Sequence, residues 1–330
     1  MNEALNSKSK HFTLYALAEG VYAAIAEDGG AAICNAGLID LGGQTIVFDT
    51  FLTPQAALDL RRFATDQTSR APTIVINSHY HNDHTWGNQV FAAEAQIISS
   101  ARTRALIATA GMEEFRWYSA NSAQQLESVR TQRQNASVET QQQELLLWIG
   151  YYEGLVEALP YLTVCMPGIT FDNRLMIHGA QRTAELITFE GAHTGSDSVL
   201  YLPQEGLVFM SDLLFVDCHP YLADGDAGML LKALREISQL EAACYVPGHG
   251  PTGTSEDVKS LIAYVEGCLE TAHALVKAGD VSEDRIKELE IAGRFQHWRF
   301  PQFYRTNIRF LCGRLSAAQQ ESGVIPGSSR

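Results

Sequence analysis

Residues 77–84 read Asn-Ser-His-Tyr-His-Asn-Asp-His (NSHYHNDH) and directly follow an apolar run. Four side chains in this stretch can bind a metal, those of His79, His81, Asp83 and His84, although the chain has only 10 histidines among 330 residues. Protonated imidazoles packed this closely would repel one another, and a divalent cation removes that conflict. Imidazole nitrogen and carboxylate oxygen suit zinc, iron or manganese. The motif therefore predicts a metal site at the end of a strand.

The spacing of the motif predicts two ligand positions. His79 and His81 are two residues apart, which excludes a helical i, i+4 pair. In an extended loop, alternate residues point the same way, so these two histidines can share one ion. Asp83 and His84 come after the bend and face a second position. Two ions need more ligands than this loop offers, and we expect the others at the ends of further strands.

Three downstream turns each carry one ligand-type residue just after a predicted strand. His193 follows the strand expected at 185–189, Asp212 the one at 207–210, and His249 the one at 243–246. A glycine or another small residue beside each ligand permits a close approach. These three side chains are therefore candidates to complete a two-metal site.

The pattern His-x-His-x-Asp-His, then a lone histidine, an aspartate and Gly-His-Gly, resembles the metallo-β-lactamase-fold hydrolase superfamily between Phe12 and Gly250. This resemblance implies the α/β class, as a four-layer αββα sandwich with a two-metal site along one edge of its sheets. It also implies that Asp212 bridges both metals. Asp49, in the pattern Phe-Asp-Thr, is implied to orient a ligand from behind.

The resemblance implies three further ligands for each metal. Those of the first metal are His79, His81 and His193. Those of the second are Asp83, His84 and His249.

Two metals about 3.5–4 Å apart can share a water and lower its pKa to near 7. The expected reaction is therefore hydrolysis of a carbonyl compound, an ester, thioester, lactone or β-lactam, by a metal-bridging hydroxide. Asp83 is the expected catalytic residue, because it can orient that nucleophile. The expected cofactor is two Zn²⁺ per chain, with iron or manganese as alternatives.

With aspartate at position 212, the ligand pattern resembles that of the glyoxalase II-like, lactonase and phosphodiesterase branches and not that of the true β-lactamases. Family lactonases carry a tyrosine three residues further on, where this chain has Phe215. A mononuclear iron persulfide dioxygenase uses the same ligand types, so the sequence leaves it open beside a phosphodiesterase. A non-catalytic metal-binding protein ranks last, because all seven ligand positions are filled.

Composition restricts the partners. The net charge of −14 repels polyanions over a screening length of about 8 Å. We therefore expect a small acyl substrate and no nucleic acid. No segment approaches the ~18 apolar residues of a membrane helix, and the N-terminus lacks an apolar signal core. Six cysteines without a Cys-x-x-Cys pair indicate reduced thiols. Together these features predict a cytoplasmic protein that does not bind membranes.

One domain, residues 1–330, is expected, with two helical additions. Residues about 100–162 are rich in glutamine and predict a helical insertion. Its apolar stretch Leu145–Val156 predicts a lid or a homodimer contact. Residues about 254–320 predict C-terminal helices behind the capping pattern that begins at Thr254. Strands are expected at 12–17, 21–26, 31–41 and 45–48.

Substrate contacts are expected from two regions. His219 and Tyr221 follow the bridging aspartate closely enough to lie near the site as hydrogen-bond donors. Aromatic side chains of the insertion are candidates for the wall of an acyl pocket, and they are Trp117, Tyr118, Trp148, Tyr151 and Tyr152.

Overall fold

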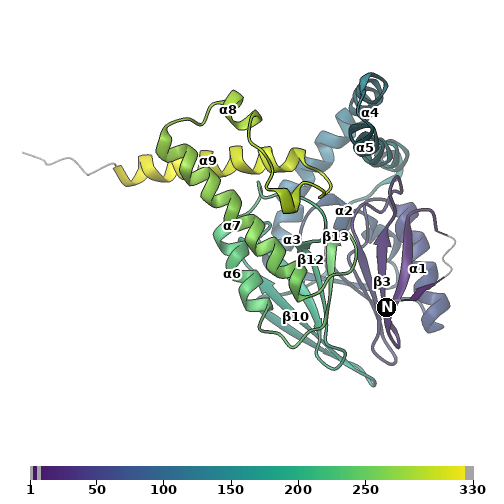
Figure 1. Ribbon diagram of the computed structural model, residues 1–330. Helices are drawn as coiled ribbons and strands as arrows, with labels where there is room; N and C mark the ends of the chain where they lie inside the picture. The colour runs from purple at the N-terminus through teal and green to yellow at the C-terminus, as the bar shows by residue number, and fades with distance from the viewer. Residues whose placement is uncertain (1–2, 6–8, 324–330) are drawn as a thin grey trace, which may run out of the picture.

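The computed structural model describes residues 3–5 and 9–323, which form two sheets packed face to face (Figure 1). The first sheet contains, in spatial order, β1 (Glu3–Leu5), β2 (Phe12–Ala18), β3 (Val21–Ala26), β4 (Ala36–Asp40), β5 (Thr45–Phe48), β6 (Ile74–Ile76), β7 (Gln96–Ser100) and β8 (Ile169–Phe171). The second contains β13 (Cys244–His249), β12 (Leu207–Phe215), β11 (Asp197–Leu202), β10 (Thr183–Phe189) and β9 (Arg174–His178).

Both sheets mix parallel and antiparallel pairs. β5 to β8 run parallel, and so do β12 and β13, whereas the other neighbouring strands are antiparallel. Apolar side chains from the facing strands fill the space between the sheets, as where the rings of Phe48 and Phe209 lie 6.1 Å apart. Burial of this two-sided apolar surface holds the sheets together.

Helices cover the outer face of each sheet, so the predicted αββα order is confirmed (Figure 1). α1 (Pro54–Thr68) buries Ala57, Leu60 and Ala64 against the first sheet. The Thr53 hydroxyl caps its first turn by accepting a hydrogen bond from the Ala56 N–H. α6 (Ala227–Ile237) and α7 (Ser255–Ala278) bury their apolar faces against the second sheet.

The insertion is a helical hairpin. It comprises α3 (Ala101–Leu106), the π-helical turn η2 (Ile107–Gly111), α4 (Met112–Asn135), α5 (Glu139–Ala158) and the 3₁₀ turn η3 (Leu159–Tyr161). α4 and α5 are separated by a short connection in which Ala136 and Val138 adopt extended backbone. Leu155 of α5 is buried on the sandwich, whereas Leu146 and Val156 are 36% and 38% exposed. The homodimer contact at this surface stays a prediction.

The C-terminal helices pack on the hydrophobic core of the second sheet. α7 supplies the fourth layer, and Thr254 and Asp257 form the predicted capping box at its start. α8 (Glu283–Lys287), the 3₁₀ turn η4 (Gly293–Phe295) and α9 (Gln302–Gly323) follow, and α9 extends the same core with Ile308 and Leu311. Within the described ranges, no helix is both long and apolar enough to cross a membrane.

One expected strand is shorter than predicted. The strand expected at 31–41 begins only at Ala36, because the preceding residues leave the first sheet to contact the second. Asn35 donates hydrogen bonds from its backbone N–H to the Gly248 carbonyl and from its side-chain amide to the Pro247 carbonyl. This contact joins the start of β4 to the end of β13.

Gly87 provides a test of how tightly the motif is seated. It lies in the 3₁₀ turn η1 (Trp86–Val90), and a Cβ at this position would be 1.9 Å from the Thr50 carbonyl oxygen. We expect Gly87→Ala to lower the free energy of unfolding by about 1–3 kcal/mol, because the backbone at position 87 must move away from the backbone at Thr50. Chemical denaturation measures this change.

Gly267→Ala is the matched control, since a Cβ there meets no atom within 4 Å. Gly267 lies inside α7, so alanine should raise the free energy of unfolding by about 0.5–1 kcal/mol. Equal effects at both glycines would contradict the tight packing inferred for Gly87.

Candidate metal centre

One segment after a strand of the first sheet and three segments of the second sheet and its loops meet at one end of the sandwich. His79 and His81 follow β6, and α2 (Asn82–Thr85) then carries Asp83 and His84 on one short turn. The other three residues come from the second sheet and its loops, and they are His193, Asp212 and His249. The structure thus brings together all seven side chains that the sequence proposed as ligands.

Asp212 reaches the site from inside a strand and not from the turn that the sequence predicted. β12 continues to Phe215, and its pairing with β13 shifts register on both sides of Ser211. Ser211 has a left-handed backbone with φ of 48°. A bulge of this kind re-aims a side chain, and here it lets consecutive residues, Ser211 and Asp212, both serve the site.

The first group of ligand atoms is compact. His81 Nδ1 lies 3.0 Å from His79 Nε2 and 3.2 Å from His193 Nε2. Asp212 Oδ2 lies 3.2 Å from His193 Nε2. Ligand atoms about 2.0–2.1 Å from a shared tetrahedral zinc ion are about 3.4 Å apart. These separations therefore fit one cation.

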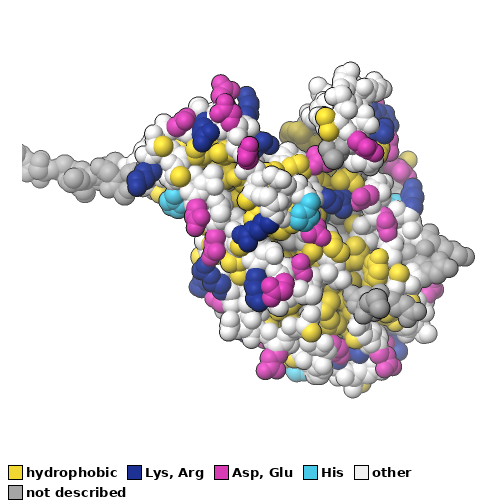
Figure 2. All heavy atoms as spheres, viewed as in Figure 1, with side chains coloured by type: hydrophobic (Ala, Val, Ile, Leu, Met, Phe, Trp, Pro, Cys, Tyr) yellow, Lys and Arg dark blue, Asp and Glu magenta, His cyan; other side chains and the backbone are white. Residues whose placement is uncertain are grey.

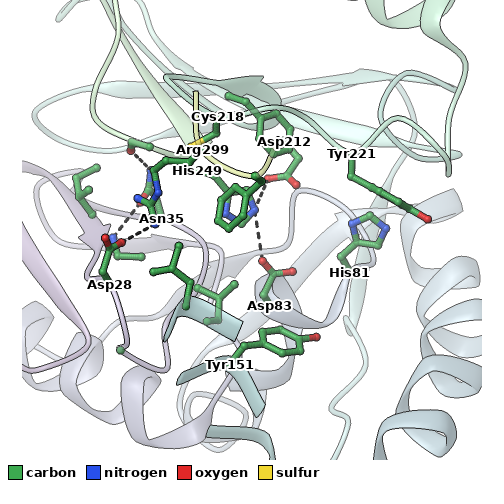
Figure 3. A pocket seen from close by; sticks show the side chains of 18 of the residues that line it. Asp28, Asn35, His81, Asp83, Tyr151, Asp212, Cys218, Tyr221, His249 and Arg299 are labelled. Atoms are coloured by element: carbon green, nitrogen blue, oxygen red, sulfur yellow. Dashed lines mark hydrogen bonds and ion pairs between the residues drawn. The ribbon is translucent and has the colours of Figure 1, made fainter. Parts of the chain in front are cut away.

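The second group faces the other oxygen of the same aspartate. Asp212 Oδ1 lies 3.2 Å from His84 Nε2 and 3.4 Å from His249 Nε2. Asp83 Oδ2 lies 3.5 Å from His249 Nε2 and 3.6 Å from His84 Nε2. Figure 3 shows Asp83 and Asp212 meeting at His249. Asp212 is thus placed to present one oxygen to each group.

A buried carboxylate behind the ligands selects their tautomers. Asp49 Oδ2 accepts hydrogen bonds from His84 Nδ1 at 2.8 Å and from the Ser78 and Ser211 hydroxyls at 2.8 and 2.9 Å. The Ser78 hydroxyl lies 2.9 Å from His79 Nδ1. Because the hydroxyl hydrogen is donated to Asp49, the hydroxyl oxygen accepts a hydrogen bond from the N–H of His79 Nδ1. Both histidines therefore direct an unprotonated Nε2 into the site, as a metal requires.

His81 is held in the opposite tautomer, with the proton on Nε2. Its Nε2 donates to Asp224 Oδ2 at 2.9 Å, so its Nδ1 is the nitrogen with a free lone pair. That lone pair faces the lone pair of His79 Nε2 at 3.0 Å. Two lone pairs at this distance repel unless a cation lies between them. The buried His84 Nε2 and Asp212 Oδ1 also have no hydrogen-bond partner among the described residues. The residues present therefore fit a pair of divalent cations.

The protonation states of His79 and Asp212 favour the same conclusion, whereas the acidic groups around His84 outweigh its burial and raise its pKa, so that a cation there would replace a proton. Burial, together with the neighbouring His84 and His81, holds the pKa of His79 well below its usual value, so this ring is neutral. Burial opposes ionisation of Asp212, but the adjoining imidazoles of His249 and His84 outweigh it and hold the pKa of this carboxyl well below its usual value. A neutral imidazole and an ionised carboxylate are the ligand forms.

Comparison with known proteins identifies the family. The model of the metallo-β-lactamase superfamily matches residues 29–249, which is most of the chain. The chain belongs to this superfamily. Its members generally depend on metals, so divalent cations are the expected occupants of the His/Asp cluster. A search of curated proteins found no match.

Solved structures of this superfamily share the fold. A metallo-β-lactamase from Erythrobacter litoralis, with β-mercaptoethanol in its active site, has 16% identity and a TM-score of 0.57, covering 80% of this chain and 100% of that chain. The mono-zinc form of FIM-1 from Pseudomonas aeruginosa has 15% identity and a TM-score of 0.55, covering 79% and 97%. A metallo-β-lactamase from Pontibacter korlensis has 15% identity and a TM-score of 0.53, covering 81% and 99%. At this identity the likeness establishes the fold.

A cavity of about 740 Å³ opens onto the metal centre. Tyr118, Trp148 and Tyr151 of the insertion line it, as the sequence proposed, whereas Trp117 is 48% exposed on the outside. Residues from the start of α9 and from the loop after β3 close the other sides. Figure 3 shows Tyr221 beside His81 and Tyr151 below Asp83.

His219 lies elsewhere. The sequence placed it near the site, but its ring is fully buried in the C-terminal core, 3.0 Å from the Tyr264 hydroxyl and packed against Trp298. Burial lowers the pKa of His219 to about 4. Of the two expected hydrogen-bond donors, Tyr221 lines the cavity and His219 does not.

Several site residues were missed. Ser78 and Ser211 each precede a ligand, so small polar residues beside the ligands were an available signal. No sequence signal marked Asp224 and Glu114, because only the tertiary structure brings these two residues to the site.

Asp49→Asn tests the orienting role of the buried carboxylate. An uncharged amide with one acceptor oxygen cannot hold the two histidines in the required tautomers, so we expect zinc affinity to fall about 10–100-fold. Competition with a chromophoric chelator measures it. Asp66→Asn, at an exposed position of α1, is the control. Unchanged affinity in Asp49→Asn would show that the carboxylate does not organise the ligands.

Proposed function

We propose that the protein is a dinuclear zinc-dependent hydrolase that cleaves a small carbonyl compound. The observation that carries this proposal is Asp212, whose two oxygens each lie 3.2 Å from a histidine of a different ligand group. A carboxylate placed in this way can bridge two cations. Two divalent cations bound there would supply an acidified water and a Lewis acid for the carbonyl oxygen.

The proposed roles of the chain's own residues follow from their positions. Asp212 would bridge both cations. The remaining ligands of the first cation would be His79, His81 and His193. Those of the second would be Asp83, His84 and His249. Asp83 Oδ2 lies at the rim of its group and lines the cavity, so it can orient the attacking water and accept its proton.

The cavity wall favours hydrolysis by water over covalent catalysis. Cys218 lines the cavity, but burial raises the pKa of its thiol to about 12, so it is not a thiolate at neutral pH. The cavity is deep enough for a small molecule, and the face of the molecule in Figure 2 shows acidic and basic side chains interspersed. A small acyl compound suits this site better than a polymer.

Metal removal and return test the proposal. Protein stripped by a chelator should lose turnover of an activated ester such as p-nitrophenyl acetate, and two equivalents of Zn²⁺ should restore it. His81→Ala should lower kcat/KM at least about 100-fold, because it removes a ligand. His273→Ala, an exposed position on α7, should leave kcat/KM unchanged.

Other outcomes would point to another chemistry. Full metal occupancy without turnover of esters, thioesters, lactones or β-lactams would overturn the acyl hydrolase. One iron per chain with oxygen consumption on glutathione persulfide would replace it by a dioxygenase. Turnover of a phosphodiester and of no acyl compound would show that the protein is a phosphodiesterase.

A further inference from the structure

The wall of the cavity carries an excess of negative charge. Its carboxylates are Glu27, Asp28, Asp83, Glu114, Asp212 and Asp224. Against these six stands one guanidinium, that of Arg299, which pairs with Asp28 at 2.6 Å. Two divalent cations would cancel four of the five excess charges. With Glu114 ionised one negative charge remains, and with Glu114 protonated the cavity is neutral; neither state attracts an anionic substrate.

Most of these carboxylates already have partners. Asp28 pairs with Arg299, Asp224 accepts from His81 and Tyr80, and Glu27 accepts from the Thr13 hydroxyl. Glu114 differs, because its Oε2 is buried and has no hydrogen-bond partner among the described residues. A buried carboxylate oxygen without a partner is costly, and the structure of a complex should supply one.

Glu114 also lacks a countercharge. It projects from the first turn of α4, and the nearby carboxylates of Asp83 and Asp224 outweigh the opposite influence of His84 and of the Asn82 backbone N–H. Burial and these two carboxylates raise the pKa of Glu114 to about 8. Among the described residues, the only lysine or arginine that lines the cavity is Arg299, which already pairs with Asp28. The position of Glu114 therefore suits a positive charge supplied from outside the chain.

An aromatic wall continues from Glu114 across the cavity. Tyr118 lies one turn further along α4 and so shares a face with Glu114. From Tyr118 the ring centroids are 5.8 Å to Tyr151, then 5.7 Å to Trp148, and Trp148 lies 6.3 Å from Phe303. Phe303 is 5.6 Å from Tyr221. Aromatic faces beside a carboxylate are the surroundings that bind an organic ammonium group.

We propose that the acyl substrate carries a positively charged amine, which the Glu114 carboxylate and the aromatic wall of Tyr118, Tyr151, Trp148, Phe303 and Tyr221 bind while the carbonyl lies at the metal centre. This inference rests on the proposed hydrolase for the reaction, but the cation site stands on the cavity alone. The cavity of about 740 Å³ holds both parts of such a molecule.

Binding tests the cation site without any turnover. In calorimetric titration of the zinc-loaded protein, benzyltrimethylammonium should bind, and Glu114→Gln should weaken its binding at least about tenfold. Glu113→Gln is the matched control, because Glu113 precedes Glu114 on α4 and is exposed. Glu114→Asp keeps the charge and should retain part of the affinity. No binding by the unaltered protein, or equal binding by Glu114→Gln, would overturn the inference.

Kinetics tests the same preference within the reaction. Acetylcholine and its uncharged isostere 3,3-dimethylbutyl acetate differ in charge and hardly in shape. The protein should favour the cation in kcat/KM at least about tenfold, mainly through KM, and Glu114→Gln should remove that preference. Equal turnover of both esters without ammonium binding would overturn the cation site and leave the hydrolase. Glu114-dependent ammonium binding without turnover of either ester would support the cation site and count against the hydrolase.

Discussion

The lone pairs of His79 Nε2 and His81 Nδ1 face each other across 3.0 Å, and a cation between them removes their repulsion. The outer hydrogen bonds make the constraint strict. The Ser78 hydroxyl, which itself donates to Asp49, accepts a hydrogen bond from His79 Nδ1, and Asp224 accepts one from His81 Nε2. Neither ring can relieve the repulsion by exchanging its tautomer without breaking a buried or half-buried hydrogen bond. The remainder of the site is arranged around this requirement.

The sandwich meets this requirement because both sheets end at the same edge. The first sheet delivers the motif after β6, and the second delivers Asp212 from a bulge in β12 and His249 from the end of β13. Asp49, after β5, joins the two sets, since it accepts from Ser78 and from Ser211. The two additions to the fold then close the cavity, the insertion through α4 and α5 and the C-terminal part through the start of α9. Figure 1 shows both additions at this end of the molecule.

The ligands could be predicted from sequence because short-range rules determine them. An i, i+2 histidine pair in a loop after an apolar strand has few alternatives, and each later ligand lies beside a small residue near a strand end. The cavity was harder to predict. Of the five expected aromatic residues, Tyr118, Trp148 and Tyr151 line the cavity and Trp117 and Tyr152 do not, because which face of a helix is buried depends on its tertiary partner. The same limit explains His219, whose neighbour Tyr221 lines the cavity while it packs into the core, and Glu114, which no local pattern marks.

The central claim is that seven side chains converge on two cations with Asp212 between them. Anomalous diffraction at the zinc edge, from crystals of the zinc-loaded protein, tests it most directly. The account predicts two peaks about 3.5–4 Å apart, one among His79, His81 and His193, the other among Asp83, His84 and His249. A single peak at full zinc occupancy, or peaks away from these side chains, would contradict it.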